Sequence, residues 1–223
     1  TGAFTYVDKD GNTMFTVNFS PKATHFVDAA TAWSDLANSS PLTDILNLAR
    51  VISTDSYNKP TILTMGSNAL NNFMKNAEVQ ALLDNRRIDL GGINDPESVG
   101  AGGELHGTIS VGEYKFEIRS YDKKYRDPQT KAKIPYLGVD MVVVSTAGAR
   151  MDATYGVVPR LAAPEARVLK YLPSNIQNTS QGINMFPFAS LNRDATGLDV
   201  SVSARPLLVP TDIDSFGAID TNP

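Results

Sequence analysis

The final residues of the chain are Val200-Ser-Val-Ser-Ala-Arg-Pro-Leu-Leu-Val-Pro-Thr-Asp-Ile-Asp-Ser-Phe-Gly-Ala-Ile-Asp220, and they contain two runs that are typical of β-strands. Residues 200–210 alternate in polarity and then become apolar, and residues 216–219 form a second, shorter apolar run. The residues between them favour a turn, because the short carboxylates of Asp212 and Asp214 can bond to nearby backbone amides. The sequence therefore predicts a strand pair that completes a sheet begun earlier in the chain.

The composition is that of an ordinary globular chain. The 223 residues are 42% hydrophobic and 20% charged, enough for one large domain or two small ones with their own cores. A formal net charge of −4 argues against a dedicated nucleic-acid-binding protein, which usually carries a basic face. The lack of cysteine excludes disulfides, thiol nucleophiles and cysteine zinc sites. No run of about 18 apolar residues occurs, so we expect no membrane span.

The N-terminal part predicts a hairpin followed by a helix. Residues 4–7 and 14–19 are rich in β-formers and flank an Asp-Gly pair that favours a tight turn. Ser40 suits a helix N-cap, and the following proline suits the first turn. The expected buried stripe of this helix consists of Leu42, Ile45, Leu46, Ala49 and Ile52. Trp33, the only tryptophan, is expected to be buried as a packing residue. Because the chain has neither an initiator methionine nor a signal peptide, we expect a truncated or processed chain.

The middle of the chain predicts a mixed α/β unit. Residues 61–65 form a short apolar strand, and a turn at 66–68 leads into a second helix that ends near Arg86 and Arg87. The glycine-rich residues 91–107 predict a flexible loop. Further strands are expected at 108–111, 114–121, 134–144, 153–158 and within 186–203, with a loop or short helix at 162–182. We expect the N-terminal hairpin and the C-terminal strands to share one sheet, with residues 40–160 inserted between them.

The order of these motifs resembles the major capsid protein E family of lambda-like tailed phages. The resemblance rests on the segment Ala32-Trp33-Ser34-Asp35, the helix start Pro41-Leu42-Thr43-Asp44-Ile45 and the strand-to-helix unit ending in Leu83-Asp-Asn-Arg-Arg87. It continues through Ile134-Pro135-Tyr136, Ala153-Thr-Tyr-Gly-Val157, Phe186-Pro187-Phe188 and Ala204-Arg-Pro-Leu-Leu-Val-Pro210. Each motif alone is weak, and their order along the whole chain is the specific signal.

This resemblance implies an α+β fold of the Hong Kong 97-like phage capsid type. It divides the chain into a peripheral β-sheet domain at residues 1–39 and 161–223, with an α/β axial domain inserted at residues 40–160. The resemblance implies that an N-terminal arm, an extended loop and a spine helix would precede Thr1, and we expect this chain to lack them.

The resemblance also implies a structural function. The expected protein self-assembles into hexamers and pentamers of an icosahedral shell that encloses viral DNA without reading its sequence. It would be a non-enzymatic virion component, assembled in the host cytoplasm, with a scaffolding or head-decoration protein as a further partner and no cofactor. The alternative on the same fold is an encapsulin-like nanocompartment shell.

Candidate subunit-interface residues lie at two basic sites. The segment 122–133 has five basic and two acidic residues, a local charge of +3 on a chain of −4. Its candidates are Lys123, Lys124 and Arg126, and a solvated hairpin tip is the alternative interpretation. Arg86 and Arg87 form the second site, where capping of a helix C-terminus by cations is favoured over an interface role.

An alternative from another class is a serine hydrolase using Ser67 and His106. Ser67 follows a strand-to-helix turn, but the second glycine of a Gly-x-Ser-x-Gly elbow is missing, and a helix cap is favoured. His25 and His106 are expected to be ordinary polar or edge-strand histidines. The glycines at 100–103 lack the Lys-Ser/Thr of a phosphate loop, and Asp8, Asp10 and Asn12 are read as a hairpin turn rather than a calcium loop. No metal or cofactor site is expected.

Overall fold

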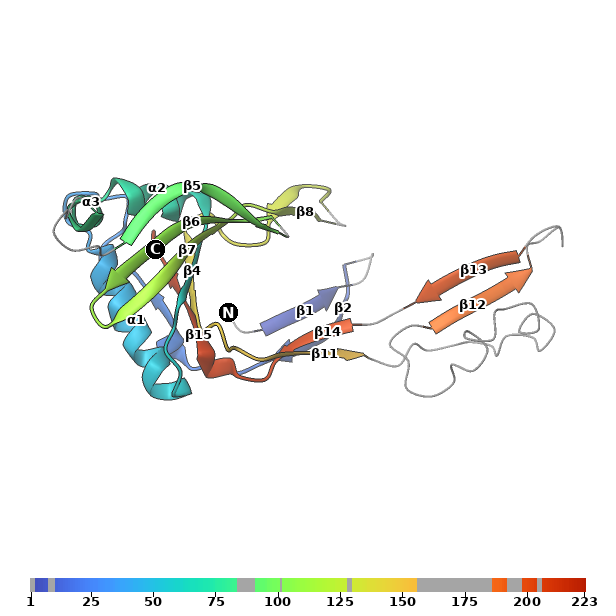
Figure 1. Cartoon of the computed structure of the whole chain (residues 1–223). Helices are drawn as coiled ribbons and strands as arrows, with labels where there is room; N and C mark the ends of the chain where they lie inside the picture. Colours follow the sequence, from blue (N-terminus) through green and yellow to red (C-terminus); the bar gives the residue numbers. More distant parts are fainter. Residues whose placement is uncertain are drawn as a thin grey trace. The chain divides into compact units, whose positions relative to one another are not determined.

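The computed structural model describes residues 3–7, 11–83, 91–100, 102–127, 130–155, 186–191, 198–203 and 206–223. The chain divides into two compact units (Figure 1). One unit combines Thr1–Arg150 with Asp212–Pro223, and the other is Met151–Thr211. These boundaries do not coincide with the expected ones at 40 and 161, and the assignment of peripheral and axial domains stays a prediction.

A seven-stranded mixed sheet organises the first unit, in the order β3-β15-β10-β4-β7-β6-β5. Its strands are β3 (Phe26–Asp28), β15 (Phe216–Asp220), β10 (Met141–Ser145), β4 (Ile62–Met65), β7 (Tyr114–Tyr121), β6 (Gly103–Val111) and β5 (Gly91–Gly100). The pairs β15–β3 and β4–β7 are parallel, and the other neighbours are antiparallel. β10 is an inner strand of this sheet and lies between β15 and β4.

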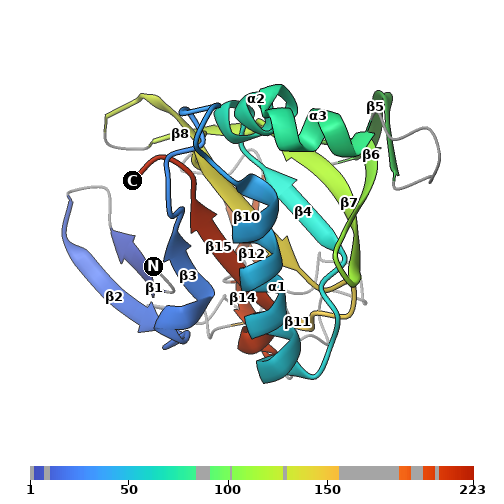
Figure 2. The same ribbon diagram turned by 90° about the vertical axis from the view of Figure 1, so that its left-hand side faces the viewer.

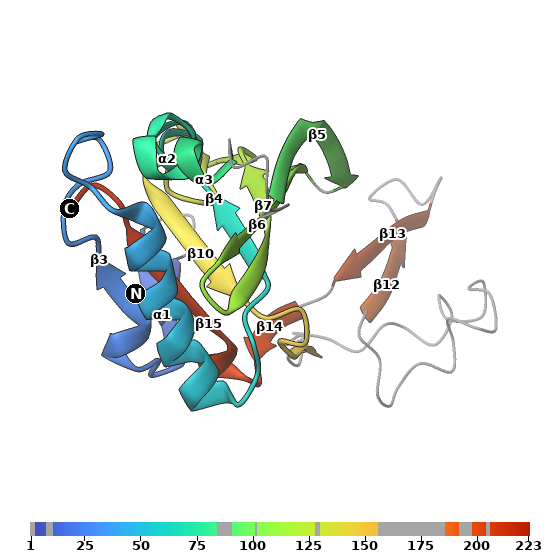
Figure 3. The same cartoon turned by 60° about the vertical axis from the view of Figure 1, so that its left-hand side comes forward.

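Helices cover one face of this sheet. Alternate residues of the central strands are fully buried, among them Leu63, Met65, Val142 and Val144, as expected when side chains point to opposite faces in turn. The helix α1 (Pro41–Ser56) lies across β10 and β15 (Figures 2 and 3). Its buried residues join those of the sheet in one hydrophobic core. The result is a two-layer unit of helices on a sheet.

Helix α1 begins where the sequence predicted. Pro41 is its first residue and Ser40 its N-cap, although the Ser40 hydroxyl donates to Glu78 Oε1 at 3.2 Å rather than capping a helix amide. The buried residues of the helix are Pro41, Ile45, Leu48, Ala49 and Ile52, whereas Leu42 and Leu46 are only partly buried. Leu48 was missed because the predicted stripe was centred slightly to one side of the observed one.

The second predicted helix is interrupted. Helix α2 (Ser67–Lys75) and helix α3 (Ala77–Leu83) are separated by Asn76, whose backbone is extended. The Asn76 side chain is buried, accepts a hydrogen bond from the Glu78 amide at 2.9 Å and donates to the Ser39 carbonyl at 3.1 Å. Asn76 therefore starts a new helix, because a short polar side chain can satisfy a helix's first amides.

The predicted loop at 91–107 is wrong. Residues 91–100 form the edge strand β5, and residues 103–107 belong to β6. Composition misled the prediction, because a glycine-rich segment gains its strand conformation from the hydrogen-bonding ladder of a neighbour. Pro96 is tolerated because it lies at a shift in register on the sheet edge, between the pairs Ile93↔Gly107 and Glu97↔Leu105.

The long strand predicted at 134–144 is two strands. β9 (Lys133–Pro135) pairs with β8 (Lys124–Arg126) in a separate antiparallel hairpin, and β10 starts only at Met141. The Gly138 carbonyl accepts a hydrogen bond from the Met141 amide at 3.1 Å, which turns the chain between them.

The predicted end of the chain is confirmed in one part and wrong in another. β15 does complete a sheet begun elsewhere, since it pairs with β3 and β10. It follows the short 3-10 helix η2 (Ile213–Ser215), the predicted turn. The preceding strand β14 (Pro206–Pro210) pairs with β11 (Met151–Tyr155) instead of β15. The N-terminal hairpin of β1 (Ala3–Val7) and β2 (Thr13–Asn18) is confirmed, but it forms its own two-stranded sheet.

The second unit consists of strand pairs in its described residues. β11 pairs with β14, and β12 (Phe186–Leu191) pairs with β13 (Leu198–Ser203). The strands expected within 186–203 are therefore confirmed. The loop or short helix expected at 162–182 lies outside the described residues.

Candidate functional site

The β8–β9 hairpin presents two chemically different faces. Its register places Lys124 opposite Pro135, Tyr125 opposite Ile134, and Arg126 opposite Lys133. Since side chains alternate along a strand, Lys124, Arg126 and Lys133 fall on one face, and Tyr125 and Ile134 fall on the other. We call these the basic face (Lys124, Arg126, Lys133) and the tyrosine face (Tyr125, Ile134, Tyr136).

The tyrosine face is apolar and exposed. The backbone amide of Tyr136 donates to the Lys123 carbonyl at 3.0 Å, which extends the pairing by one residue. Tyr136 thus lies on the same face as Tyr125, and their ring centroids are 5.0 Å apart. Tyr136 is 62% exposed and Ile134 is 36% exposed. Such a patch fits a contact that buries it, since aromatic residues are enriched in interfaces.

The basic face carries two of the predicted candidates. Lys124 and Arg126 are both exposed on it. Lys124 Nζ lies 3.5 Å from Asp122 Oδ1, and Arg126 Nε donates to the Lys131 carbonyl at 3.3 Å. Lys123, also exposed, falls on the side of the tyrosine face. Arg86 and Arg87 lie outside the described residues, so their predicted role stays a prediction.

A second apolar surface runs along β11 and β14. The register pairs Met151 with Pro210 and Ala153 with Leu208, which puts these four side chains on one face of the ribbon. Met151 is 62% exposed and Leu208 is 65% exposed. The sequence gives a weak signal for this surface, because alternation in two short strands shows a face only after their register is known.

The N-terminal hairpin also exposes apolar side chains. Met14 is 62% exposed and Phe15 is 48% exposed, although they are consecutive residues and point to opposite faces of β2. A two-stranded hairpin alone is at best marginally stable in water, so a ribbon with apolar residues on both faces favours a covered position in an assembly.

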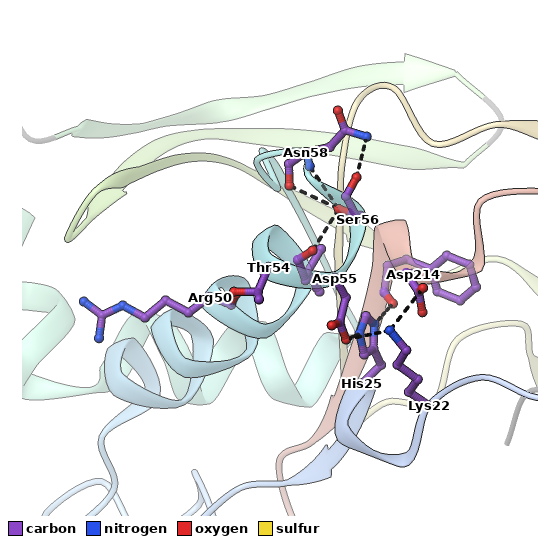
Figure 4. Close-up of polar contacts among 10 residues, drawn as sticks. Lys22, His25, Arg50, Thr54, Asp55, Ser56, Asn58 and Asp214 are labelled. Atoms are coloured by element: carbon purple, nitrogen blue, oxygen red, sulfur yellow. Dashed lines mark hydrogen bonds and ion pairs between the residues drawn. The ribbon is translucent and has the colours of Figure 1, made fainter.

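A polar cluster at the end of α1 connects three parts of the first unit (Figure 4). His25, the last residue of the 3-10 helix η1 (Ala23–His25), is fully buried. Its Nδ1 lies 3.0 Å from the Phe216 carbonyl oxygen, and its Nε2 lies 2.9 Å from Asp55 Oδ2. Both partners are acceptors, so both ring nitrogens donate only when the ring is doubly protonated.

Lys22 contacts both carboxylates of this cluster. Its Nζ lies 3.1 Å from Asp55 Oδ2 and 3.3 Å from Asp214 Oδ2. The hydrogen bond from His25, and then that from Lys22, hold the pKa of Asp55 below its ordinary value. The hydrogen bond to Asp55 raises the pKa of Lys22 in turn. The ammonium of Lys22 thus bridges the two carboxylates.

The cluster groups possible metal ligands around a lysine. The ligand atoms of His25, Asp55 and Asp214 lie within 4.8 Å of one another, a grouping that could hold a cation. The ammonium of Lys22 is already within ion-pair distance of both carboxylates. No sequence signal pointed to this cluster, because its members come from segments more than 190 residues apart and each is unremarkable alone.

The two candidates for a hydrolase have other roles. His106 Nε2 bonds to Ser120 Oγ at 2.8 Å on the neighbouring strand. Ser67 is exposed and is the first residue of α2, while Gly66 is the N-cap, so the predicted cap was placed one residue late. The amides of Asn68 and Ala69 donate to the Val139 carbonyl at 3.0 Å, which leaves no need for a serine cap.

Comparison with known families decides where this chain belongs. The family described as "Phage major capsid protein E" matches residues 2–219, nearly the whole chain. The chain belongs to this family. The resemblance stated from the order of its motifs is therefore confirmed.

Solved structures were compared with the fold. A crystal structure from E. coli CFT073, described as a prophage capsid protein, is similar with a TM-score of 0.68 at 15% sequence identity. The similarity covers 99% of this chain and 59% of that chain, so this chain spans just over half the length of that capsid protein. A phage-related protein from Bordetella bronchiseptica RB50 matches at a TM-score of 0.46 and 11% identity, over 90% of this chain and 56% of that one. The search of curated proteins found no match.

Among the residues that the structure describes, no helix has the length and apolar character needed to cross a membrane.

Proposed function

We propose that this chain is the shell-forming part of the major capsid protein of a tailed phage or prophage. The observation that carries the proposal is the family match over residues 2–219. The proposed role is structural, with no catalytic step and no cofactor. The protein would reside in the virion after assembly in the host cytoplasm.

The proposed fold is of the Hong Kong 97-like type. Within this proposal, the sheet strands β10, β4, β7, β6 and β5 belong to the axial domain at residues 40–160, and β3 and β15 belong to the peripheral domain. The similarity to the E. coli prophage protein at a TM-score of 0.68 supports a capsid fold of this general kind.

The proposed mechanism is symmetric self-association. Head-to-tail interfaces that close rings would produce hexamers and pentamers, and these would form an icosahedral shell around DNA. Exposed apolar surfaces support it, because a surface such as Met151 with Leu208 is stabilised when another subunit covers it. A scaffolding or decoration protein is a further proposed partner.

The proposed contact residues divide according to the two faces of the β8–β9 hairpin. The tyrosine face, with Lys123 at its side, is proposed to touch a neighbouring copy. Lys124 and Arg126 point to the opposite face and would border that contact rather than fill it. Arg86 and Arg87 remain proposed contacts, with capping of a helix end as the alternative.

An encapsulin-like shell shares the proposed architecture and differs in its content. A packaged cargo protein would identify such a compartment, and packaged DNA would identify a phage head. The serine hydrolase has no support, because His106 bonds to Ser120 and the family is one of capsid proteins.

Electron microscopy of the full-length gene product tests the proposal. We expect closed shells of uniform size, or sheets of hexamers and pentamers, with and without a co-expressed scaffolding protein. Particles that stay monomeric at all concentrations and salt conditions, even with the scaffold, would overturn it.

A tyrosine substitution tests the proposed contact. Tyr136→Ser in the full-length protein is expected to reduce the yield of shells. Tyr57→Ser is the matched control, because Tyr57 is 93% exposed at the end of α1 and lies outside the proposed contact. Equal yields from both variants would exclude the tyrosine face as a contact while leaving shell assembly intact.

A further inference from the structure

The basic face of the β8–β9 hairpin is an exposed cluster of cations with little apolar surface. Lys124 and Arg126 are two residues apart on one strand, and Lys133 stands directly opposite Arg126 on the other. All three are exposed. Pro135 is the only apolar residue in the paired part of this face.

This arrangement costs free energy in the isolated chain. Like charges placed directly opposite each other across two strands repel, which destabilises the hairpin. Asp122 lies 3.5 Å from Lys124 Nζ, and Asp127 Oδ2 accepts bonds from the Thr130 amide and hydroxyl that hold the turn. An external anion on this face would remove the repulsion between Arg126 and Lys133.

The chemistry favours a phosphate chain over a protein surface. A protein interface combines an apolar centre with a polar rim, and here the apolar residues other than Pro135 lie on the opposite face. Exposed cations without a shaped pocket fit the phosphates of a nucleic acid, which are contacted without reading the sequence. The overall charge of −4 would restrict such contact to the hairpin, where the local charge is +3.

We propose that the basic face binds the phosphate backbone of a nucleic acid, with Lys124, Arg126 and Lys133 each neutralising one phosphate. The contact is independent of sequence and weak in a single chain. Many copies of the basic face on one shell would strengthen the overall binding. Only this gain from multiple copies rests on the proposed function.

The salt dependence of binding tests the proposal on the unassembled chain. The affinity for a fluorescent DNA duplex is measured by anisotropy at several salt concentrations. Three neutralised phosphates predict a slope of about −2.7 for log Kobs against log salt, or about a 40-fold loss of affinity between roughly 50 and 200 mM. Arg126→Gln is expected to bring the slope closer to zero by about 0.9, and the triple variant Lys124→Gln, Arg126→Gln, Lys133→Gln to abolish the salt-dependent component.

A control variant with the same net charge separates the contribution of the basic face to DNA binding from that of the overall charge of the protein. The triple variant Lys59→Gln, Lys75→Gln, Lys115→Gln removes three exposed lysines elsewhere in the first unit and is expected to keep the slope. Circular dichroism verifies that both triple variants are folded.

Two outcomes would overturn the proposal. Equal losses of affinity in the two triple variants would mean that only net charge matters. Unchanged DNA binding in the hairpin variant, together with loss of salt-sensitive self-association, would show that this face binds carboxylates of a second copy. Shell formation is scored separately by microscopy, so failure of DNA binding and failure of assembly are distinguishable.

Discussion

His25 Nε2 and Asp55 Oδ2 lie 2.9 Å apart and connect the segment before β3 to the last turn of α1. The same imidazole reaches the Phe216 carbonyl oxygen at the start of β15. One buried ring therefore joins three segments that lie far apart in the sequence. Because removal of one partner from a buried polar network leaves the others unsatisfied, this cluster stabilises the unit only as a whole.

The first prediction concerns acid stability. The pKa of Asp55 is below its ordinary value of about 4, because His25 and Lys22 hydrogen-bond to its ionised form. A lowered pKa contributes stability that is fully present above the ordinary value and is lost as the pH falls through the lowered value. Asp55→Asn keeps an acceptor but cannot ionise. We therefore expect it to be less stable than the wild type at neutral pH, with the difference shrinking in acid.

Urea unfolding at a series of pH values between about 7 and 2 measures this effect. The two curves of unfolding free energy against pH should converge at the acid end. Parallel curves would show that the carboxylate of Asp55 gains nothing from its partners in the folded state.

The second prediction concerns the only tryptophan. Trp33 is fully buried, its Nε1 donates to Asp44 Oδ2 at 2.9 Å, and its ring lies 6.0 Å from that of Phe73. Trp33→Phe keeps an aromatic ring but removes the donor, and we expect a loss of about 1–3 kcal/mol in unfolding free energy.

Calorimetry on Trp33→Phe, Asp44→Ala and the double variant separates the hydrogen bond from the packing. Coupling of about 0.5 kcal/mol or more is expected for residues in direct contact. Strictly additive losses would mean that the indole contributes through its volume alone.

Local patterns in the sequence were sufficient to predict elements whose conformation is set by nearby residues or whose apolar residues recur at a clear spacing. The hairpin at the N-terminus, the start of α1 at Pro41 and the final strand β15 were all predicted. β5 could not be predicted, because its conformation depends on pairing with β6, which the sequence of residues 91–100 does not encode. The break at Asn76 was missed because a helical period continues across it, and only the bonds to Ser39 and Glu78 show that a new helix begins.

The sequence was sufficient to predict the basic character of the candidate site, but not the arrangement of its side chains. The local charge at residues 122–133 showed the basic hairpin. Its division into two faces needed the register, in which Arg126 opposes Lys133 and Tyr125 opposes Ile134. The family was recognised from the order of many motifs along the chain, because no single motif is specific.

The third prediction concerns Gly66, which sits where two backbone segments meet. A Cβ at this position would lie 2.6 Å from the Val139 carbonyl oxygen and would also collide with that of Gly138. The Val139 carbonyl cannot easily move, because it accepts the Asn68 and Ala69 amides. We expect Gly66→Ala to cost about 1–3 kcal/mol or more.

Gly148→Ala is the matched control, because a Cβ there meets nothing within 4 Å. Its effect on the unfolding free energy should stay within about 0.5 kcal/mol. Thermal melts of both variants followed by far-UV circular dichroism make the comparison. Similar melting temperatures for the two would mean that the backbone around Val139 adjusts to the added methyl group.

The last prediction is a gain in stability at the end of α1. Tyr57 follows the helix with φ of 58°, the left-handed conformation that glycine adopts without strain, and its side chain is 93% exposed. An L-residue in this conformation costs roughly 1–2 kcal/mol, whereas glycine adds about 0.5–1 kcal/mol of chain entropy to the unfolded state. Since little packing is lost with so exposed a ring, Tyr57→Gly should raise the unfolding free energy by up to about 1 kcal/mol.

Lys59→Gly is the control, because Lys59 is not among the positive-φ residues and glycine there brings only the entropy cost. Urea unfolding should therefore shift in opposite directions for the two variants, and a loss of stability in both would show that the tyrosine ring contributes more at the helix end than the strain costs.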